Sequence, residues 1–282
     1  MLRLQSRRPL PHPLNRATWM PRYSANLTFL FPELAFLDRF AAAKAAGFDA
    51  VEYVCLYDHP AEVLADAAKR AGVQTVLLNI PHGRWASGER GIAIFSDRVD
   101  EFRASLVQTI DYCRATGCQQ VNCLAGIMPD GADMAPLRAV FVDNLRHAAG
   151  VLGAAGIRLL IEPINTRDIP GFFLSRTRDA LSIIDDVGSD NLFLLFDCYH
   201  AQVMEGDLVA TLRQNLSRIA HIQIADNPGR NEPGTGEINY QFVLAELDRL
   251  GFPGRVGLEY RPRASTIDGL SWMASLQKSA AK

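Results

Sequence analysis

The sequence lacks several features that mark common functional classes. Its 282 residues contain no run of about eighteen apolar residues, so the sequence predicts no transmembrane helix and no membrane partner. No strand-like segment is followed by a Walker motif or by GxGxxG, which argues against a nucleotide cofactor. A net charge of −2 gives no support to nucleic-acid binding.

Cysteine is scarce and shows no pairing pattern. The chain has five cysteines, an odd number, with no CxxC pair among them, so a zinc knot is not indicated. We interpret them as reduced thiols of a cytoplasmic protein, with Cys123 and Cys198 as small buried side chains.

Residues 1–19 differ in composition from the rest of the chain. They contain four arginines, three prolines and no acid, and Met20 follows them. No apolar stretch typical of a secretory signal is present. We expect a disordered N-terminal extension over 1–19, with a mitochondrial presequence as the alternative, and one folded domain over 20–282.

What the chain does contain is a large apolar fraction in an alternating pattern. Hydrophobic residues make up 48% of the sequence. Short β-branched or aliphatic runs alternate with longer segments of helical period, as in βα units around a parallel sheet. The expected strands lie at 24–27, 50–53, 75–79, 120–123, 158–162, 192–197, 221–223 and 257–259.

The segments between these strands have the pattern of amphipathic helices. Those at 33–47, 61–72, 97–117, 135–156, 175–188 and 240–251 place apolar residues at i, i+3, i+4 and i+7, and each ends in glycine. Eight strands, each followed by a helix or a long loop, favour a closed (β/α)8 barrel over an open sheet.

Polar residues end four consecutive predicted strands. The carboxyl ends of barrel strands converge on one opening, where polar residues are more often catalytic than structural. A buried carboxylate is costly unless it is paired or bound to a metal. The strand-end residues are Glu162, Asp197, Gln223 and Glu259.

All four residues offer oxygen ligands, which favours Mg²⁺ or Mn²⁺ over Zn²⁺. The competing interpretation is that these acids form ordinary ion pairs with arginines such as Arg230 and Arg261. Four such residues at successive strand ends favour the metal site.

Longer motifs carry a family resemblance from Met20 to about Trp272. The segments "MPRYSANLTFLF", "LIEPIN", "FDCYHAQVMEGDL", "HIQIADNPGRNEPGTGEINY" and "GLEYRPR" together resemble the hydroxypyruvate isomerase family of xylose isomerase-like barrels. That family is metal-dependent and interconverts hydroxypyruvate and tartronate semialdehyde, and close relatives isomerise 2-oxo-tetronates. The resemblance implies the same four metal ligands and assigns proton transfer to Glu162 and Glu259. Related ketose 3-epimerases usually have His at the position of Gln223.

Three further residues are candidates for substrate binding. His200 follows Asp197 by three residues and can donate to a substrate oxygen or orient a carboxylate ligand. Arg230 lies in the polar loop after the strand at 221–223, where its guanidinium can bind a substrate carboxylate. His82 belongs to a long polar segment that we expect to close over the barrel mouth, together with Arg84 and Trp85.

Two acids of the loop after Gln223, Asp226 and Glu237, are expected to organise that loop. The expected partner is a small hydroxy or keto acid, and a homo-oligomer is possible.

Other functions remain as alternatives. They are a 2-oxo-tetronate isomerase, a ketose 3-epimerase, an endonuclease-IV-like repair enzyme and a metal-binding protein without catalysis. The repair enzyme would need a zinc cluster with several His ligands.

Overall fold

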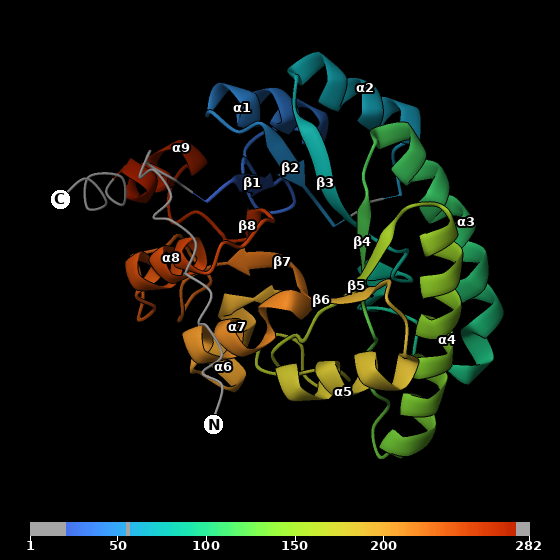
Figure 1. The fold of residues 1–282 in the computed structure, drawn as a ribbon. Coiled ribbons are helices and arrows are strands. Elements are labelled where there is room, and N and C mark those ends of the chain that lie inside the picture. The colour runs from blue at the N-terminus through green and yellow to red at the C-terminus, as the bar shows by residue number, and fades with distance from the viewer. Residues whose placement is uncertain (1–20, 55–56, 275–282) are drawn as a thin grey trace, which may run out of the picture.

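A closed barrel forms the centre of the molecule. The structure is a computed structural model that describes residues 21–54 and 57–274. Within these residues, eight parallel strands pair in sequence order and β1 closes against β8 (Figure 1). The (β/α)8 prediction is confirmed. The strands are β1 (Tyr23–Asn26), β2 (Ala50–Glu52), β3 (Gln74–Asn79), β4 (Gln120–Cys123), β5 (Arg158–Ile161), β6 (Leu192–Asp197), β7 (Ile219–Ile224) and β8 (Val256–Leu258).

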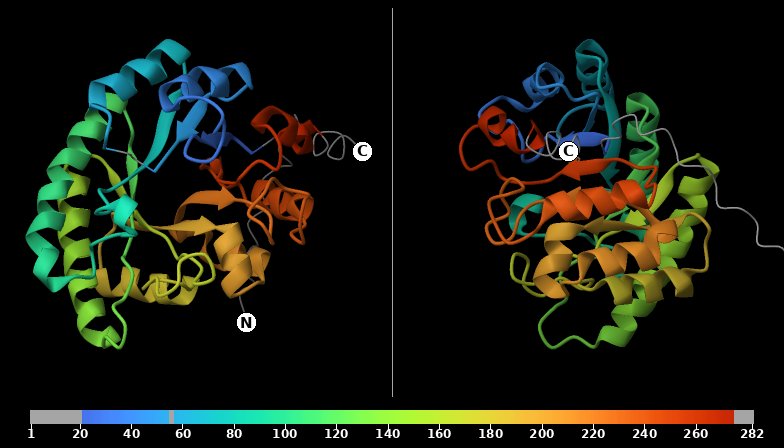
Figure 2. Two further views of the ribbon diagram at one scale, coloured as in Figure 1. Left: turned by 180° about the vertical axis from the view of Figure 1, so that it is seen from behind. Right: turned by 60° about the vertical axis from the view of Figure 1, so that its left-hand side comes forward.

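Helices surround the barrel on its outside (Figures 1 and 2). They are α1 (Arg39–Ala45), α2 (Ala61–Ala71), α3 (Val99–Thr116), α4 (Met134–Ala154), α5 (Thr177–Val187), α6 (Cys198–Met204), α7 (Leu208–Asn215), α8 (Tyr240–Arg249) and α9 (Thr266–Gly269). Short 3-10 segments are η1 (Phe36–Asp38), η2 (Trp85–Ser87), η3 (Ser96–Arg98) and η4 (Leu216–Arg218).

Helix α5 shows how the sequence pattern produces this layer. Its buried apolar side chains, Ala180, Ile183, Ile184 and Val187, recur at helical spacing and therefore form one apolar stripe. The helix ends at Gly188, whose φ of 65° is a left-handed conformation that glycine adopts without steric cost. The helix expected at 175–188 is thus confirmed.

Two parts of the helical layer differ from the sequence prediction. Helix α1 begins at Arg39 rather than near residue 33, because the Arg39 side chain donates to the carbonyls of Leu27 and Leu34 and holds the preceding segment as a turn. Helices α6 and α7, which follow β6, have no counterpart in the prediction.

The barrel interior contains both polar contacts and a small apolar cluster. Every second residue of a strand points inward. Gln120 of β4 and His221 of β7 belong to strands that are not neighbours, yet Gln120 Nε2 lies 3.3 Å from His221 Nδ1. Such a contact crosses the barrel. Leu77, Leu160 and Leu195 form a separate buried apolar cluster.

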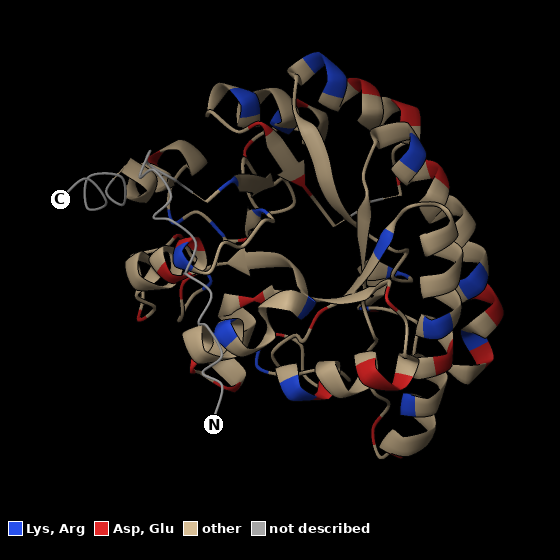
Figure 3. Ribbon diagram, viewed as in Figure 1, with Lys and Arg blue, Asp and Glu red and all other residues tan. Residues whose placement is uncertain are grey.

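The outer surface carries charges of both signs, and the described cysteines form no disulfide. Acidic and basic residues are interspersed along α2, α3 and α4 (Figure 3). Four cysteines are buried and free, and Cys55 lies outside the described residues. No helix in the described ranges is long and apolar enough to cross a bilayer. The expectation for residues 1–19 falls outside the described part of the chain.

Candidate metal and active site

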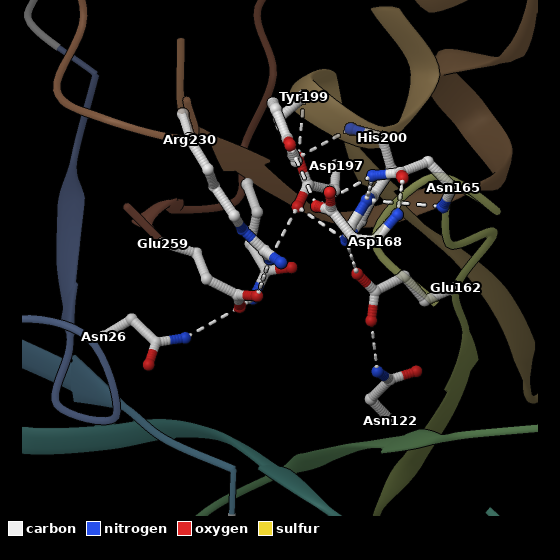
Figure 4. A network of polar contacts seen from close by, with 12 residues as sticks. Asn26, Asn122, Glu162, Asn165, Asp168, Asp197, Tyr199, His200, Arg230 and Glu259 are labelled. Carbon is white, nitrogen blue, oxygen red and sulfur yellow. Dashed lines mark hydrogen bonds and ion pairs between the residues drawn. The ribbon is translucent and has the colours of Figure 1, made fainter. Parts of the chain in front are cut away.

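The four strand-end residues meet at one mouth of the barrel. Asp197 is the last residue of β6 and Gln223 lies near the end of β7, while Glu162 and Glu259 directly follow β5 and β8. All four are buried. One carboxylate oxygen each of Glu162, Asp197 and Glu259 and a ring nitrogen of His200 lie within 4.8 Å of one another. Figure 4 shows Glu162 and Glu259 on opposite sides of the cluster.

Two oxygens of the four strand-end residues are buried without a hydrogen-bond partner, Asp197 Oδ2 and Gln223 Oε1. The other oxygen of Asp197 accepts the backbone N–H of Tyr199 at 2.7 Å and so caps α6. Buried acceptors are rarely left unsatisfied. A hard cation bound by oxygen atoms would satisfy both, so the residues present fit Mg²⁺ or Mn²⁺.

Amide side chains hold the two glutamates in place. Asn122 donates to Glu162 Oε2 at 2.7 Å. Asn26 and Gln223 donate to Glu259 Oε2 at 2.8 and 2.5 Å. One oxygen of each carboxylate is thereby fixed. The second oxygen of Glu162 lies 3.7 Å from His200 Nε2, and that of Glu259 is paired with Arg230.

The electrostatics of the cluster also favour a cation. Burial, and then the neighbouring Asp197, raise the pKa of Glu162 to about 8. Burial likewise raises the pKa of Asp197 and holds that of Glu259 well above its usual range. The three acids therefore lack sufficient positive charge, and a divalent ion among them would favour their ionised forms.

His200 lies in the cluster, and its ring points an N–H group at the acids. Its Nδ1 receives the Nδ2–H of Asn165 at 2.6 Å, and the Asn165 oxygen is already engaged by the Asp168 N–H at 2.7 Å. Since Nδ1 accepts, the proton of the neutral ring is on Nε2, which lies 3.5 Å from Asp197 and 3.7 Å from Glu162. Burial lowers the pKa of His200 well below its usual value. His200 is therefore suited to donate a hydrogen bond.

Arg230 reaches the cluster from the loop after β7. It forms ion pairs with Glu259 and, at 3.6 Å, with Asp197. Its guanidinium carbon lies 4.8 Å from the ring centre of Phe29 and 5.3 Å from that of Tyr199. Arg230 Nε is buried without a hydrogen-bond partner. The arginine is thus part of the site, and part of its donor capacity is unused.

Asp226 builds the loop that carries Arg230. The carboxylate accepts five backbone N–H groups, at distances from 2.8 to 3.1 Å, from Asn227 and from four residues of the segment 234–238. Glu237, which is exposed, accepts from Asn227 Nδ2 at 2.5 Å. The expectation that both acids organise the loop agrees with these contacts.

A cavity of about 200 Å³ opens above the cluster. This is smaller than the roughly 300–1,000 Å³ of pockets for drug-sized ligands, so a ligand of a few carbons fits. Trp85 and Arg90 line it, with the Arg90 guanidinium carbon 3.7 Å from the ring centre of Trp85. A wider cavity of about 690 Å³ lies over residues 84–101, where Arg84 and Arg98 pair with Glu89. Because the carboxylate cluster lies at the smaller cavity, we place the candidate site there.

The expected lid segment contributes differently from the prediction. Trp85 lines the cavity, but Arg84 is exposed and paired with Glu89. His82 is buried beside Trp85, with ring centres 4.7 Å apart, and is not part of the cavity wall. Its direct contact is with Trp85.

Sequence reasoning missed the amides. Asn26 ends β1 and Asn122 lies next to the end of β4, so the same strand-end rule that found the acids applies to them. Arg90 carries no comparable signal, because its place in the wall depends on the conformation of the loop after β3.

Comparison with known proteins places the chain in a family. A family model described as xylose isomerase-like TIM barrel matches residues 40–276. Over 254 residues the chain is 48% identical to hydroxypyruvate isomerase of Escherichia coli K12, covering 90% of this chain and 98% of that protein. The chain belongs to the hydroxypyruvate isomerase family.

Other proteins similar to this chain carry different names. A 2-oxo-tetronate isomerase of Cupriavidus necator is 45% identical over 90% of this chain and 98% of its own length. A crystal structure described as AP endonuclease, family 2, from Brucella melitensis is 40% identical with a TM-score of 0.88, covering 91% of this chain and 99% of that one. The relatives named as isomerases identify this member of the family as an enzyme of the isomerase class.

The role of Asp226 can be tested through stability. Asp226→Asn removes the charge and places an N–H group among backbone donors, so we expect a loss on the order of 3 kcal/mol in the free energy of unfolding, or about 6–12 °C in Tm. The matched change Asp66→Asn, on an exposed acid of α2, should leave Tm within about 1 °C. Equal melting of Asp226→Asn and the parent protein in calorimetry would contradict this role.

Proposed function

We propose that the chain is a metal-dependent isomerase that interconverts hydroxypyruvate and tartronate semialdehyde. The observation that carries this proposal is the pair of buried glutamates, Glu162 and Glu259, on opposite sides of a small acidic cluster (Figure 4). This reaction moves a carbonyl between adjacent carbons, so one proton must leave a carbon and another must be returned to its neighbour. Two carboxylates facing the same small cavity are suited to that exchange.

The ligands that we assign to the cation are Glu162, Asp197, Gln223 and Glu259. When bound, Mg²⁺ or Mn²⁺ would supply positive charge that stabilises the negative charge developing on the substrate oxygens. The buried oxygens of Asp197 and Gln223 that lack a hydrogen bond support this assignment. His200 Nε2–H would then donate to a substrate oxygen.

In this proposal Glu162 and Glu259 act as the proton-transfer pair. Asn122 holds one oxygen of Glu162. Asn26 and Gln223 hold one oxygen of Glu259 and Arg230 pairs with the other, so Arg230 would have to release that oxygen before it exchanges a proton. One glutamate would take a proton from one carbon and the other would give a proton to the adjacent carbon from the opposite side, while the hydroxyl proton moves to the oxygen that was the carbonyl.

We assign substrate binding to Arg230 and, indirectly, to His82. Arg230 Nε is buried and unpartnered, so a substrate carboxylate or oxygen can accept its hydrogen bond. His82 supports Trp85, which lines the cavity. The 200 Å³ volume is in keeping with an acid of three or four carbons.

Two further features of the setting are part of the proposal. The free buried thiols of Cys113, Cys118, Cys123 and Cys198 support a cytoplasmic location, since such thiols persist in a reducing compartment. Association of identical chains stays a prediction.

Three other functions compete with this one. The relative from C. necator favours a 2-oxo-tetronate, a substrate one carbon longer. A ketose 3-epimerase could use the same two glutamates. The name of the relative from B. melitensis suggests DNA containing abasic sites as a substrate. Against DNA repair by a zinc cluster, the potential metal-binding group found among the described residues contains one histidine, His200.

A substrate comparison separates these possibilities. Purified protein would be incubated with Mg²⁺ or Mn²⁺, with and without chelator, and given hydroxypyruvate, a 2-oxo-tetronate, a ketohexose or an abasic-site duplex. We expect tartronate semialdehyde from hydroxypyruvate, and its loss with chelator. Faster turnover of the 2-oxo-tetronate or of the ketohexose, or cleavage of the duplex, would replace the proposal with the corresponding alternative.

The two-glutamate mechanism predicts the effect of amide substitutions. Glu162→Gln and Glu259→Gln keep the shape and a ligating oxygen but cannot accept the proton. Each should therefore lower kcat by about 10²–10⁴-fold at saturating Mn²⁺ while leaving the circular dichroism spectrum unchanged. Glu62→Gln on the exposed face of α2 is the control and should keep parental turnover. Near-parental kcat for either cluster variant refutes the mechanism.

Substrate binding by Arg230 predicts a change in KM. Arg230→Lys replaces a planar donor with a single ammonium, and the loss of a charge-assisted hydrogen bond should raise KM for hydroxypyruvate about tenfold or more. Arg255→Lys is the matched control, because Arg255 pairs with Asp49 beside the opposite ends of the strands. Its KM should match that of the parent, and an unchanged KM in Arg230→Lys would exclude the assigned contact.

A further inference from the structure

A fourth buried carboxylate lies inside the barrel, outside the cavity wall. Glu52 is the last residue of β2 and has no exposed surface. Unlike the three acids of the cluster, it is fully provided with donors. They are Ser24 Oγ at 2.6 Å, Asn26 Nδ2 at 3.3 Å, His221 Nε2 at 2.8 Å and Gln223 Nε2 at 2.8 Å.

The Glu52 carboxylate fits beside a glycine of β8, which has no side chain in its way. Gly257 lies in the middle of β8, where a glycine weakens a strand and usually marks a close approach. A Cβ atom at this position would collide with both carboxylate oxygens of Glu52. The side chain of Glu52 therefore fills the volume that a residue at position 257 would otherwise occupy.

A second chain of hydrogen bonds fixes Glu52 from the far side of the barrel. Gln120 Nε2 lies 3.3 Å from His221 Nδ1, and an amide nitrogen can only donate. His221 Nδ1 therefore accepts, and the Nε2–H of the ring is directed at Glu52. The acceptor oxygens of Glu52 are thus held in position by three strands.

This arrangement determines which way the amide of Gln223 faces. Its Nε2 lies 2.8 Å from Glu52 Oε1 and 2.5 Å from Glu259 Oε2, and both neighbours accept hydrogen bonds. The reversed amide would place its oxygen against two carboxylates, without a donor between them. Gln223 Oε1 is consequently directed away from Glu52 and is left unpartnered, and Gln223 lines the cavity.

We propose that Glu52 is a positioning residue that holds the amide nitrogen of Gln223 inward and thereby presents Gln223 Oε1 to the cation. This inference rests on the proposed metal dependence. Partners outside the ligand shell that orient a ligand are typically worth about 10–100-fold in metal affinity. Glu52 acts here through Gln223 and touches neither the cation nor the substrate.

The test is a double-mutant cycle on metal affinity. Mn²⁺ would be titrated calorimetrically into the chelator-stripped parent protein and into the variants Glu52→Gln, Gln223→Ala and both together. We expect Glu52→Gln to weaken Mn²⁺ binding about 10–100-fold in the parent. In the Gln223→Ala background the same change should weaken it less than about threefold, because the oriented ligand is already absent.

Two controls separate orientation from loss of charge or of fold. Glu52→Asp keeps the charge but withdraws the acceptor from Gln223, so it should follow the pattern of Glu52→Gln, and it also serves if Glu52→Gln does not fold. Glu205→Gln removes a charge from the exposed Glu205, which accepts the N–H of Thr177, and should leave Mn²⁺ affinity unchanged. Tm is measured for every variant.

The outcomes distinguish the inference from the function on which it rests. If the parent binds Mn²⁺ and Glu52→Gln weakens binding by the same factor in both backgrounds, Glu52 does not act through Gln223 and the inference is overturned. Unchanged affinity in Glu52→Gln overturns it as well. If the parent itself binds no Mn²⁺, the proposed metal dependence fails first, and the positioning role fails with it.

Discussion

The site depends on the cost of burying several carboxylates in one closed barrel. Burial raises the pKa of Glu162, Asp197 and Glu259. Burial also acts on Glu52, but there the contacts with His221, Gln223 and Ser24 outweigh it and lower the pKa. Glu52 is thus stabilised by protein donors alone. The three acids of the cluster contact only Arg230, His200 and amide groups, and this deficit of positive charge is the physical basis for a cation at the mouth.

Arg230 links this charge balance to the loop after β7. The loop contains few apolar side chains, so backbone hydrogen bonds must define its shape. Asp226 supplies the acceptors, and the result is an arginine in a left-handed conformation, with φ of 55°, whose guanidinium reaches Glu259. Loop structure and site electrostatics are therefore coupled through one buried aspartate.

The sequence was sufficient for the fold and for the acids. Strand ends could be predicted because apolar runs stop at a polar residue, as at Asp197, and parallel closure then brings those ends together. The partner of Glu52 could not be predicted, because its contact with His221 joins β2 to β7 across the barrel and depends on strand register. Likewise, the tautomer of His200 depends on Asn165, and the place of His82 beside Trp85 depends on a loop conformation that residue types do not specify.

The close fit of Glu52 against Gly257 has a consequence for how this barrel can change over evolutionary time. A side chain at position 257 requires the space now filled by the Glu52 carboxylate, and shortening residue 52 alone leaves a void beside His221 and Gln223. Each single substitution is therefore unfavourable on its own, while a paired exchange could restore the packing. The two positions are expected to covary among homologous barrels, and a lineage that exchanged both would also need a new means of orienting residue 223.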